Sequence, residues 1–316
     1  MPSVEQRLFE LIAAGQGDIA VPGRGSTLSR WQTLARVASE DLALVKLFEG
    51  HTDAIAILDE LGSTWLGSTG VWGTWAAEPP QAKLRLHRRG DRVRLSGRKA
   101  WCSGADIVTH SLVTCWDEQD RQCLAAVDMT DPGVMVTKQG WNAIGMGLVA
   151  SPDVLFDDAE AVTVGLADDY VTRPGFWHGG CGIAACWYGG ALPLAQALVE
   201  AVQRRAEPHA EAHLGAVDVA LRSLRALLIE GATWIDENPH ESAQGLALRL
   251  RAAADETATL VHTRVGRGLG AGPLCRDPDI AQRFADLPVF IRQTHAERDL
   301  AELGRLVARG SGGWSL

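Results

Sequence analysis

Six cysteines supply the strongest metal ligands and nucleophiles in this 316-residue chain, and their spacing limits what they do. No two of them are separated by the two residues of a CxxC pair, from which structural zinc sites are usually built. The spacing therefore predicts no metal centre and favours reduced thiols that pack as small apolar side chains. The cysteines are Cys102, Cys115, Cys123, Cys181, Cys186 and Cys275.

A glycine string at residues 266–270, Gly-Arg-Gly-Leu-Gly, is similar to part of a dinucleotide-binding loop. In a Rossmann fold such a loop follows a β-strand and opens a helix, so that backbone N–H groups meet the phosphates. No strand pattern precedes this string, and we therefore reject Rossmann binding.

The charge balance is 30 basic against 39 acidic residues, a formal net charge of −9 with a pI near 5.5. Nucleic-acid binding needs clustered Lys and Arg, so this balance argues against nucleic acid as a main partner. No apolar stretch reaches the ~18 residues needed to span a bilayer. The N-terminus also lacks the basic and apolar pattern of a signal peptide. We therefore expect a cytoplasmic protein without a membrane partner.

Three parts of the chain follow different hydrophobic periods. Residues 1–12 and 31–61 have helical apolar spacing, with a break expected at Gly50–Asp53, and residues 15–29 are predicted to be a loop. Alternation at 84–95 around the turn Arg89-Gly90-Asp91 predicts a hairpin. Further strands are expected at 107–116, 122–128, 133–138 and 150–156.

The last part is helical again, with an almost wholly apolar stretch from Cys181 to Val202 that Pro193 is expected to kink or split. Stripes at 214–228 and 246–261 and a segment at 279–308 complete a four-helix bundle. The expected fold class is α+β, mostly α. Its domains are a short N-terminal helical domain (1–68), a small antiparallel β-barrel (69–164) and a C-terminal helical bundle (165–316).

Three short motifs in the middle part carry a resemblance to a known family. Residues 97–105 (GRKAWCSGA) resemble the G-x-K-x-W-x-[ST]-x-[AG] stretch of the acyl-CoA dehydrogenases. Residues 127–134 resemble that family's "vd…pGv" strand, and residues 141–158 its "w…Gm..s…v.fddv" exit from the barrel. Cys275-Arg276-Asp277 fits the "RD" step before the last helix. The resemblance covers roughly residues 30–308 and implies this family's barrel-and-bundle fold.

The resemblance implies FAD bound between the barrel and the bundle. It places the indole of Trp101 on the flat face of the flavin, where aromatic rings stack, and the Ser103 hydroxyl at the flavin's N5 or O4 edge. Trp75 and Ala77 belong to the segment WAAEP, whose backbone amides would face the pyrimidine ring. Ala77 stands where the family has Thr, so one hydroxyl contact is missing.

Two further groups are implied to contact the FAD of a neighbouring subunit. Arg204 and Arg205 lie near the position where the family binds the pyrophosphate, and Arg suits bidentate phosphate contact. A solvated pair at a helix end is the alternative. Gly266 and Gly268 fall on the family's Gly-rich turn between the last two helices, where missing side chains permit close approach. A plain helix terminus is the alternative there.

The catalytic base is the weakest part of the resemblance. In the family a carboxylate removes a proton alpha to a thioester, and its two usual positions fall here on Ala285 and Ile183. Asp286 is the nearest acid, with a helix N-cap as its structural alternative. His178 is a second candidate base, or a helix-start residue at an interface. His295 is a third, or part of a solvated charged face.

The resemblance therefore predicts an FAD-dependent oxidoreductase that acts on a CH–CH bond of a small acyl thioester, with an electron-transfer flavoprotein as a possible acceptor. The missing carboxylates leave two alternatives open: a flavin-dependent monooxygenase of the same fold, and a catalytically silent subunit of a hetero-oligomer. A homo-dimer or homo-tetramer is expected, because a lone bundle would leave part of Cys181–Leu198 exposed.

Overall fold

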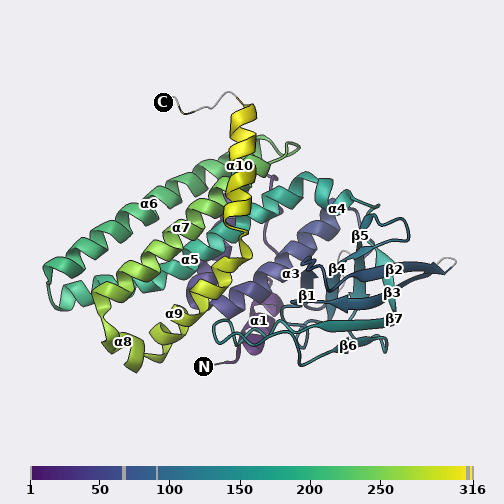
Figure 1. The fold of residues 1–316 in the computed structure, drawn as a ribbon, viewed down its shortest axis with the longest axis horizontal. Helices are drawn as coiled ribbons and strands as arrows, with labels where there is room; N and C mark the ends of the chain where they lie inside the picture. Colours follow the sequence, from purple (N-terminus) through teal and green to yellow (C-terminus); the bar gives the residue numbers. More distant parts are fainter. Residues whose placement is uncertain (1, 66–68, 90–91, 311–313, 315–316) are drawn as a thin grey trace. The chain divides into compact units, whose positions relative to one another are not determined.

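The fold was analysed in a computed structural model that describes residues 2–65, 69–89, 92–310 and 314. By its internal contacts the chain forms two compact units (Figure 1). The first unit comprises residues 1–19, 43–143 and 147–176, and the second comprises residues 20–42, 144–146 and 177–316. The division into three domains at residues 68 and 164 stays a prediction.

The N-terminal helices are α1 (Val4–Ala13), α2 (Thr27–Glu40) and α3 (Leu42–Glu60). The predicted break at Gly50–Asp53 is wrong, since α3 continues through it. Its polar groups find partners in the first unit: the Gly50 carbonyl accepts from Thr74 Oγ1 at 2.8 Å, and His51 Nδ1 accepts from the Trp72 N–H at 3.2 Å. The chain breaks instead after α2, where Asp41 is extended.

The first unit is built on a small β-barrel. Five strands close it in the order β4-β2-β3-β7-β5, with β5 pairing back to β4, while β1 adds to β4 and β6 adds to β7. The pairings are antiparallel apart from β1–β4 and β2–β4. The strands are β1 (Trp72–Trp75), β2 (Leu84–Arg89), β3 (Arg92–Lys99), β4 (His110–Trp116), β5 (Gln122–Asp128), β6 (Val134–Val136) and β7 (Val154–Thr163).

Each predicted strand region contains a strand, and the barrel is confirmed. The strand expected at 150–156 begins at Val154 and continues to Thr163. The strand expected from 107 begins at His110, because residues 104–108 form a turn in which the N–H groups of 107 and 108 reach the Gly104 carbonyl. Gly90 and Asp91 of the predicted hairpin turn lie outside the described residues.

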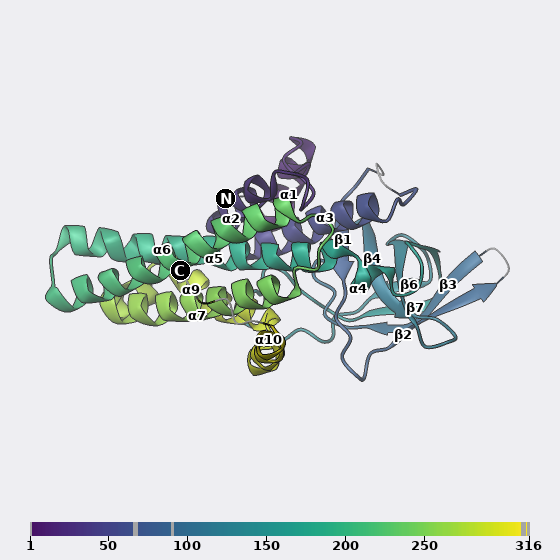
Figure 2. The same cartoon turned by 90° about the horizontal axis from the view of Figure 1, so that it is seen from above.

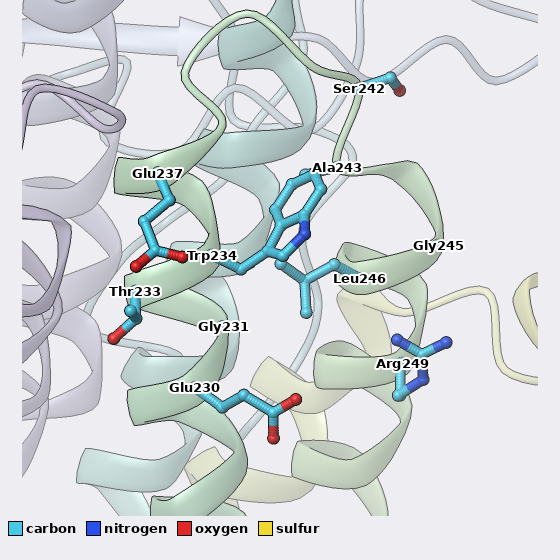
Figure 3. A pocket seen from close by; sticks show the side chains of 10 residues that line it. All are labelled: Glu230, Gly231, Thr233, Trp234, Glu237, Ser242, Ala243, Gly245, Leu246 and Arg249. Carbon is cyan, nitrogen blue, oxygen red and sulfur yellow. The ribbon is translucent and has the colours of Figure 1, made fainter. Parts of the chain in front are cut away.

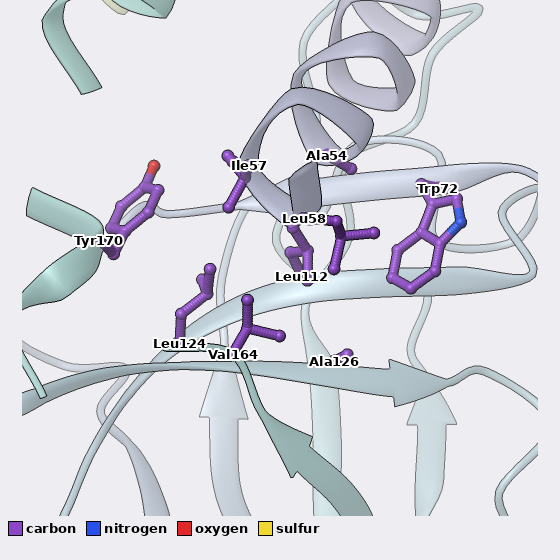
Figure 4. Close-up of a cluster of buried hydrophobic side chains, with 9 residues drawn as sticks. All are labelled: Ala54, Ile57, Leu58, Trp72, Leu112, Leu124, Ala126, Val164 and Tyr170. Atoms are coloured by element: carbon purple, nitrogen blue, oxygen red, sulfur yellow. The ribbon is translucent and has the colours of Figure 1, made fainter. Parts of the chain in front are cut away.

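The core of the first unit forms where α3 packs on the sheet (Figure 4). Ala54, Ile57 and Leu58 of α3 meet Trp72, Leu112 and their neighbours in one cluster of buried side chains. The short helix α4 (Asp169–Thr172) adds Tyr170 to it. Burial of this apolar area, at about 25 cal/mol per Å², fixes α3 against β1 and β4.

The second unit contains the long helices α5, α6 and α7, which run side by side (Figure 2). Pro193 does not split α5, which is one helix of 31 residues. Helix α10 packs on α7, and α2 packs on α6. The helices are α5 (Pro174–Arg204), α6 (Pro208–Glu237), α7 (Gln244–Leu269), α8 (Ala271–Arg276), α9 (Pro278–Phe290), the 3-10 turn Ile291–Gln293 and α10 (Glu297–Arg309).

The last helical segment expected at 279–308 is helical over most of its length and divides into α9 and α10. The break is held by polar contacts: Arg251 donates to the Gln293 carbonyl at 2.8 Å, and the His295 N–H donates to Asp299 at 3.0 Å. The confirmed C-terminal helical bundle is thus three long helices with a fourth, interrupted one.

The apolar stretch of α5 is mostly buried within the chain itself. Cys181, Trp187 and Leu194 are fully covered, and a Cβ at Gly189 would collide with the backbone of Ala35 in α2. By length and composition α5 could cross a membrane, but 67% of its most apolar window is buried in the protein, as in a core helix. Parts of the stretch, such as Leu192 and Gln196, are not fully buried, and the homo-oligomer expected from it stays a prediction.

Candidate functional site

Two chain segments that the motifs single out meet at one end of the barrel. Trp75 ends β1, is buried, and donates its indole N–H to the Ser103 carbonyl at 3.1 Å. Ser103 lies in the turn that follows β3. The structure thus joins the predicted site residues Trp75 and Ser103 by a hydrogen bond.

The turn after β3 presents the indole of Trp101 outward. Trp101 has φ +56° and remains 52% exposed, although side chains of its size are mostly covered in folded proteins. Its neighbours fix this turn, since the N–H groups of Cys102 and Gly104 donate to the carbonyls of Pro152 and Ala150 at 3.0 and 2.9 Å. A left-handed backbone at a non-glycine residue costs about 1–3 kcal/mol and is often found at functional sites.

The Ser103 hydroxyl has a partner in the loop before β7. Its Oγ lies 2.9 Å from Oγ of Ser151, which is buried. We call the side chains of Trp75, Trp101, Ser103 and Ser151, together with the backbone of residues 76–78, the barrel face. Ser151 was not predicted as a site residue, although it stands in the exit motif at 141–158.

The segment after β1 is tied to the barrel by Glu78, which follows the half-buried Ala77. Glu78 Oε1 pairs with Lys99 Nζ at 2.7 Å and also accepts from the Thr114 hydroxyl. Its Oε2 accepts from the Trp116 indole N–H at 2.6 Å. Sequence reasoning missed Glu78 and Lys99 as site residues, and the signal was their place inside the two motifs WAAEP and GRKAW.

Asp286 lies inside α9 and is 2% exposed. Its Oδ1 accepts hydrogen bonds from the Met146 N–H and from Gln282 Nε2, the latter at 2.8 Å. Burial raises its pKa, while these two hydrogen bonds lower it. The N-cap alternative is wrong, because Asp277 caps α9 and Asp286 comes nine residues later. Asp286 instead holds the chain segment at Met146.

The two candidate histidines are engaged in different ways. His178 is buried in α5, and its Nε2 lies 3.0 Å from the Glu241 carbonyl. His295 is on the surface, with Nδ1 3.4 Å from Asp299. These contacts hold each imidazole ring and do not show that it transfers a proton. A role for His178 as a base therefore stays a prediction.

Arg204 and Arg205 are exposed at the end of α5, with Arg204 4.0 Å from Glu200. Gly266 and Gly268 are inside α7, so the expected glycine turn is wrong at these two positions. A Cβ at Gly268 would lie 2.6 Å from Leu198, and one at Gly266 would lie 3.2 Å from Phe284. The contacts of these four residues with a cofactor stay a prediction.

A groove of 560 Å³ lies in the second unit between the end of α6 and the start of α7 (Figure 3). Trp234 and Leu246 lie in its middle, with Glu230 and Arg249 on opposite sides. None of the predicted site residues lines it. Among the described residues, no group of three or more His, Cys, Asp or Glu side chains is placed to hold a metal ion.

Two features of the barrel face bear on whether a flavin could be held there. An exposed indole on a fixed turn offers a flat surface for stacking on a conjugated ring. The paired hydroxyls of Ser103 and Ser151, the first of them in the same turn as Trp101, offer a hydrogen-bond donor. A flavin needs these two features, a flat apolar cover and a donor at its polar edge.

Solved structures of several enzymes share this fold. MsuC, a methanesulfinate monooxygenase from Pseudomonas fluorescens, matches with a TM-score of 0.84 at 18% identity, over 97% of this chain and 90% of that one. TdsC from Paenibacillus sp. A11-2, in complex with FMN and indole, matches at 0.79 and 16%, over 90% and 84%. A nitrososynthase from Micromonospora carbonacea var. africana matches at 0.80 and 17%, over 96% and 88%.

Neither the protein-family models nor the sequences of curated proteins give a match to this chain. At identities of 16–18% the structural likeness concerns the fold alone. The chain therefore has the acyl-CoA dehydrogenase-like fold, mostly helical with one small β-barrel, on which flavin-dependent enzymes such as FMN-bound TdsC are built.

Proposed function

We propose that the protein is a flavin-dependent monooxygenase that adds one oxygen atom to a sulfur or nitrogen atom of a small molecule. The observation that carries the proposal is the barrel face, in which the exposed Trp101 indole stands in the same turn as Ser103, whose hydroxyl pairs with that of Ser151. The choice of chemistry is supported by the names of the structural neighbours, a methanesulfinate monooxygenase, a dibenzothiophene monooxygenase and a nitrososynthase.

In this reaction reduced flavin supplies the two electrons and two protons with which O₂ is split between product and water. One oxygen atom goes to the lone pair of the substrate heteroatom, and the other leaves as water. The residues of the barrel face bind and orient. The Trp101 indole would cover one flat face of a bound ring and keep water from it. The Ser103 hydroxyl would donate to the ring edge, where reduction adds electron density, and Ser151 would hold that hydroxyl in place.

The state of Asp286 argues against the acyl-thioester dehydrogenase. That reaction needs a carboxylate free to take a proton, yet Oδ1 of Asp286 is held by Met146 and Gln282. The two positions expected for the base carry the apolar residues Ala285 and Ile183. One observation favours the dehydrogenase as the second candidate: burial raises the pKa of Asp286, which suits a base.

FMN is the flavin we propose, in place of the FAD that the sequence resemblance implies. TdsC of the same fold binds FMN. Gly266 and Gly268, expected near the adenine of FAD, pack against Phe284 and Leu198 inside the second unit. A homo-dimer or homo-tetramer and a cytoplasmic location remain part of the proposal. An electron-transfer flavoprotein belongs to the dehydrogenase alternative alone.

The deciding experiment supplies the protein with FMN, NADH and a separate flavin reductase under ¹⁸O₂, with a panel of thioethers, sulfinates and primary amines. The expected result is a product that carries one ¹⁸O atom, formed only when protein, reductant and oxygen are all present. A parallel anaerobic reaction offers acyl-CoA esters to the oxidised flavoprotein. Bleaching of the flavin there, with no ¹⁸O product, would overturn the monooxygenase in favour of the dehydrogenase. A protein that binds neither FMN nor FAD would be the silent subunit.

A further inference from the structure

Lys99 is the one lysine among the described residues that is fully buried, with no exposed surface. Its ammonium has three N–H donors, and three acceptors surround it: Glu78 Oε1 at 2.7 Å, the Thr114 carbonyl at 2.8 Å and Thr114 Oγ1 at 2.6 Å. Burial lowers the pKa of Lys99, and the Glu78 carboxylate opposes this. Each N–H donor of the Lys99 ammonium therefore has an acceptor, and Lys99 is shielded from water, while the Glu78 side chain is 21% exposed.

The pair joins segments that are distant in sequence. Lys99 ends β3, Thr114 lies in β4, and Glu78 lies in the segment that follows β1. The indole N–H of Trp116 in β4 donates to the other carboxylate oxygen of Glu78, Oε2, at 2.6 Å. One charge pair thus fixes the segment after β1 and the end of β3 to the same strand.

Glu78 belongs to the barrel face through its backbone, and Lys99 stands directly beside that face. Glu78 follows Ala77 in the chain, and Lys99 comes two residues before Trp101, whose backbone is left-handed. The hydrogen bond from Trp75 to the Ser103 carbonyl links the same two segments a few residues further on. The Glu78–Lys99 ion pair and the Trp75–Ser103 hydrogen bond therefore hold the two segments at a nearly fixed distance.

We propose that Glu78 and Lys99 are positioning residues that set the distance between the two arms of the flavin site, residues 75–78 and 101–103. The inference rests on the proposed function, since it concerns the flavin bound there. The pair acts through the arms and touches no reacting atom.

Stability alone is a weak reason for such a pair. Removing two charges from water is costly, and a buried ion pair can often be replaced by apolar residues of similar size without loss of stability. An apolar pair, however, cannot fix the orientation of the two arms. The three N–H donors of Lys99 and the two carboxylate oxygens of Glu78 do so, because their hydrogen bonds are directional. The double variant Glu78→Gln/Lys99→Met separates the effect on stability from the effect on the position of the arms, because it removes both charges and retains the side-chain lengths.

The experiment compares wild type, Lys99→Met and the double variant by three readouts: thermal unfolding, hydrogen exchange of peptides over residues 75–79 and 100–104 without flavin, and FMN titration with the spectrum of the bound flavin. Asp117→Asn is the matched control. Asp117 is also buried in the first unit, where it accepts from the N–H groups of Gln119 and Arg121 in the turn between β4 and β5.

Lys99→Met is expected to unfold at a lower temperature, because it leaves the partly buried Glu78 carboxylate without its charged partner. The double variant is expected to recover most of that stability. Its two peptides should still exchange faster than in wild type, its FMN dissociation constant should rise at least tenfold, and the bound flavin spectrum should shift. Asp117→Asn should lose stability and keep wild-type FMN affinity.

A double variant that binds FMN within twofold of wild type, with an unchanged spectrum and unchanged exchange, would show that the pair is only structural and overturn the inference. The proposed function would survive that result. Wild-type protein that binds neither FMN nor FAD would overturn the proposed function, and the inference with it.

Discussion

The hydroxyl oxygens of Ser103 and Ser151 lie 2.9 Å apart, although 48 residues separate them in the chain. One stands in the turn after β3 and the other in the loop before β7, two strands that pair with each other. The buried Ser151 fixes the rotamer of the half-buried Ser103. A hydroxyl fixed in this way can meet the edge of a bound ring without loss of rotamer freedom.

Ser103→Ala should weaken FMN binding by about fivefold to tenfold, the value of one hydrogen bond of about 1–1.5 kcal/mol. Ser151→Ala should weaken it less, because the Ser103 hydroxyl remains but is no longer held. Fluorescence titration with FMN measures both. Ser111→Ala is the control, since its buried hydroxyl donates to Met129 Sδ elsewhere in the barrel. Equal affinity in all three variants would remove Ser103 from the site.

Asp286→Ala should lower the free energy of unfolding by about 1–3 kcal/mol, because the buried Met146 N–H loses its acceptor. Asp286→Asn retains an acceptor and should cost less. If the protein is a monooxygenase, Asp286→Asn should also retain FMN and turnover within a few-fold. A loss of about 10² in turnover with flavin still bound would identify Asp286 as a general base.

The raised pKa of Asp286 predicts that its contribution to stability decreases as the pH rises. Burial raises its pKa above the ordinary 3.8, so the folded protein binds this proton more tightly than the unfolded chain does. The stabilising contribution of the protonated group is complete below pH 3.8 and is lost as the pH rises through the raised pKa. The difference in unfolding free energy between Asp286→Asn and wild type should therefore shift in favour of the variant as the pH rises across that window. Urea unfolding of both proteins at pH 4 and pH 7 tests this, and a constant difference would contradict it.

His51 should make the first unit less stable in acid. Burial lowers its pKa to about 4 from 6.5, so the unfolded chain takes up this proton first as the pH falls. Stability is therefore complete above pH 6.5 and decreases toward pH 4, by about 3 kcal/mol at full effect. His51→Gln keeps an acceptor for the Trp72 N–H and should flatten the unfolding curve between pH 7 and pH 4.5. The exposed His209→Gln should leave the slope of wild type unchanged.

The barrel and the long helices could be predicted because their signals are local. Alternation at 84–95 and the apolar stripes of α6 and α7 follow from the period of each element. The break at Gly50–Asp53 was mispredicted because His51 and Gly50 find partners in β1, residues more than 20 positions away. No local pattern contains such a contact.

The candidate site residues also divide into those that a local motif identifies and those that it does not. Trp101 and Ser103 could be found, since they stand together in one motif. The link between Glu78 and Lys99 joins two motifs and appears only when β1, β3 and β4 are aligned. Gly266 and Gly268 formed a glycine pattern typical of a turn, yet they permit close packing of α7 against Leu198 and Phe284. A glycine string alone does not distinguish these uses.

The central claim, that the barrel face binds a flavin under Trp101, is tested most directly by FMN titration of wild type, Trp101→Ala and Trp314→Ala. Trp314 is 84% exposed near the C-terminus and serves as the matched tryptophan control. Wild type and Trp314→Ala should quench FMN fluorescence with the same dissociation constant. Trp101→Ala should raise that constant at least tenfold, about 1.4 kcal/mol, through the lost stacking surface. Equal binding by all three proteins, or no binding of FMN or FAD by wild type, would contradict it.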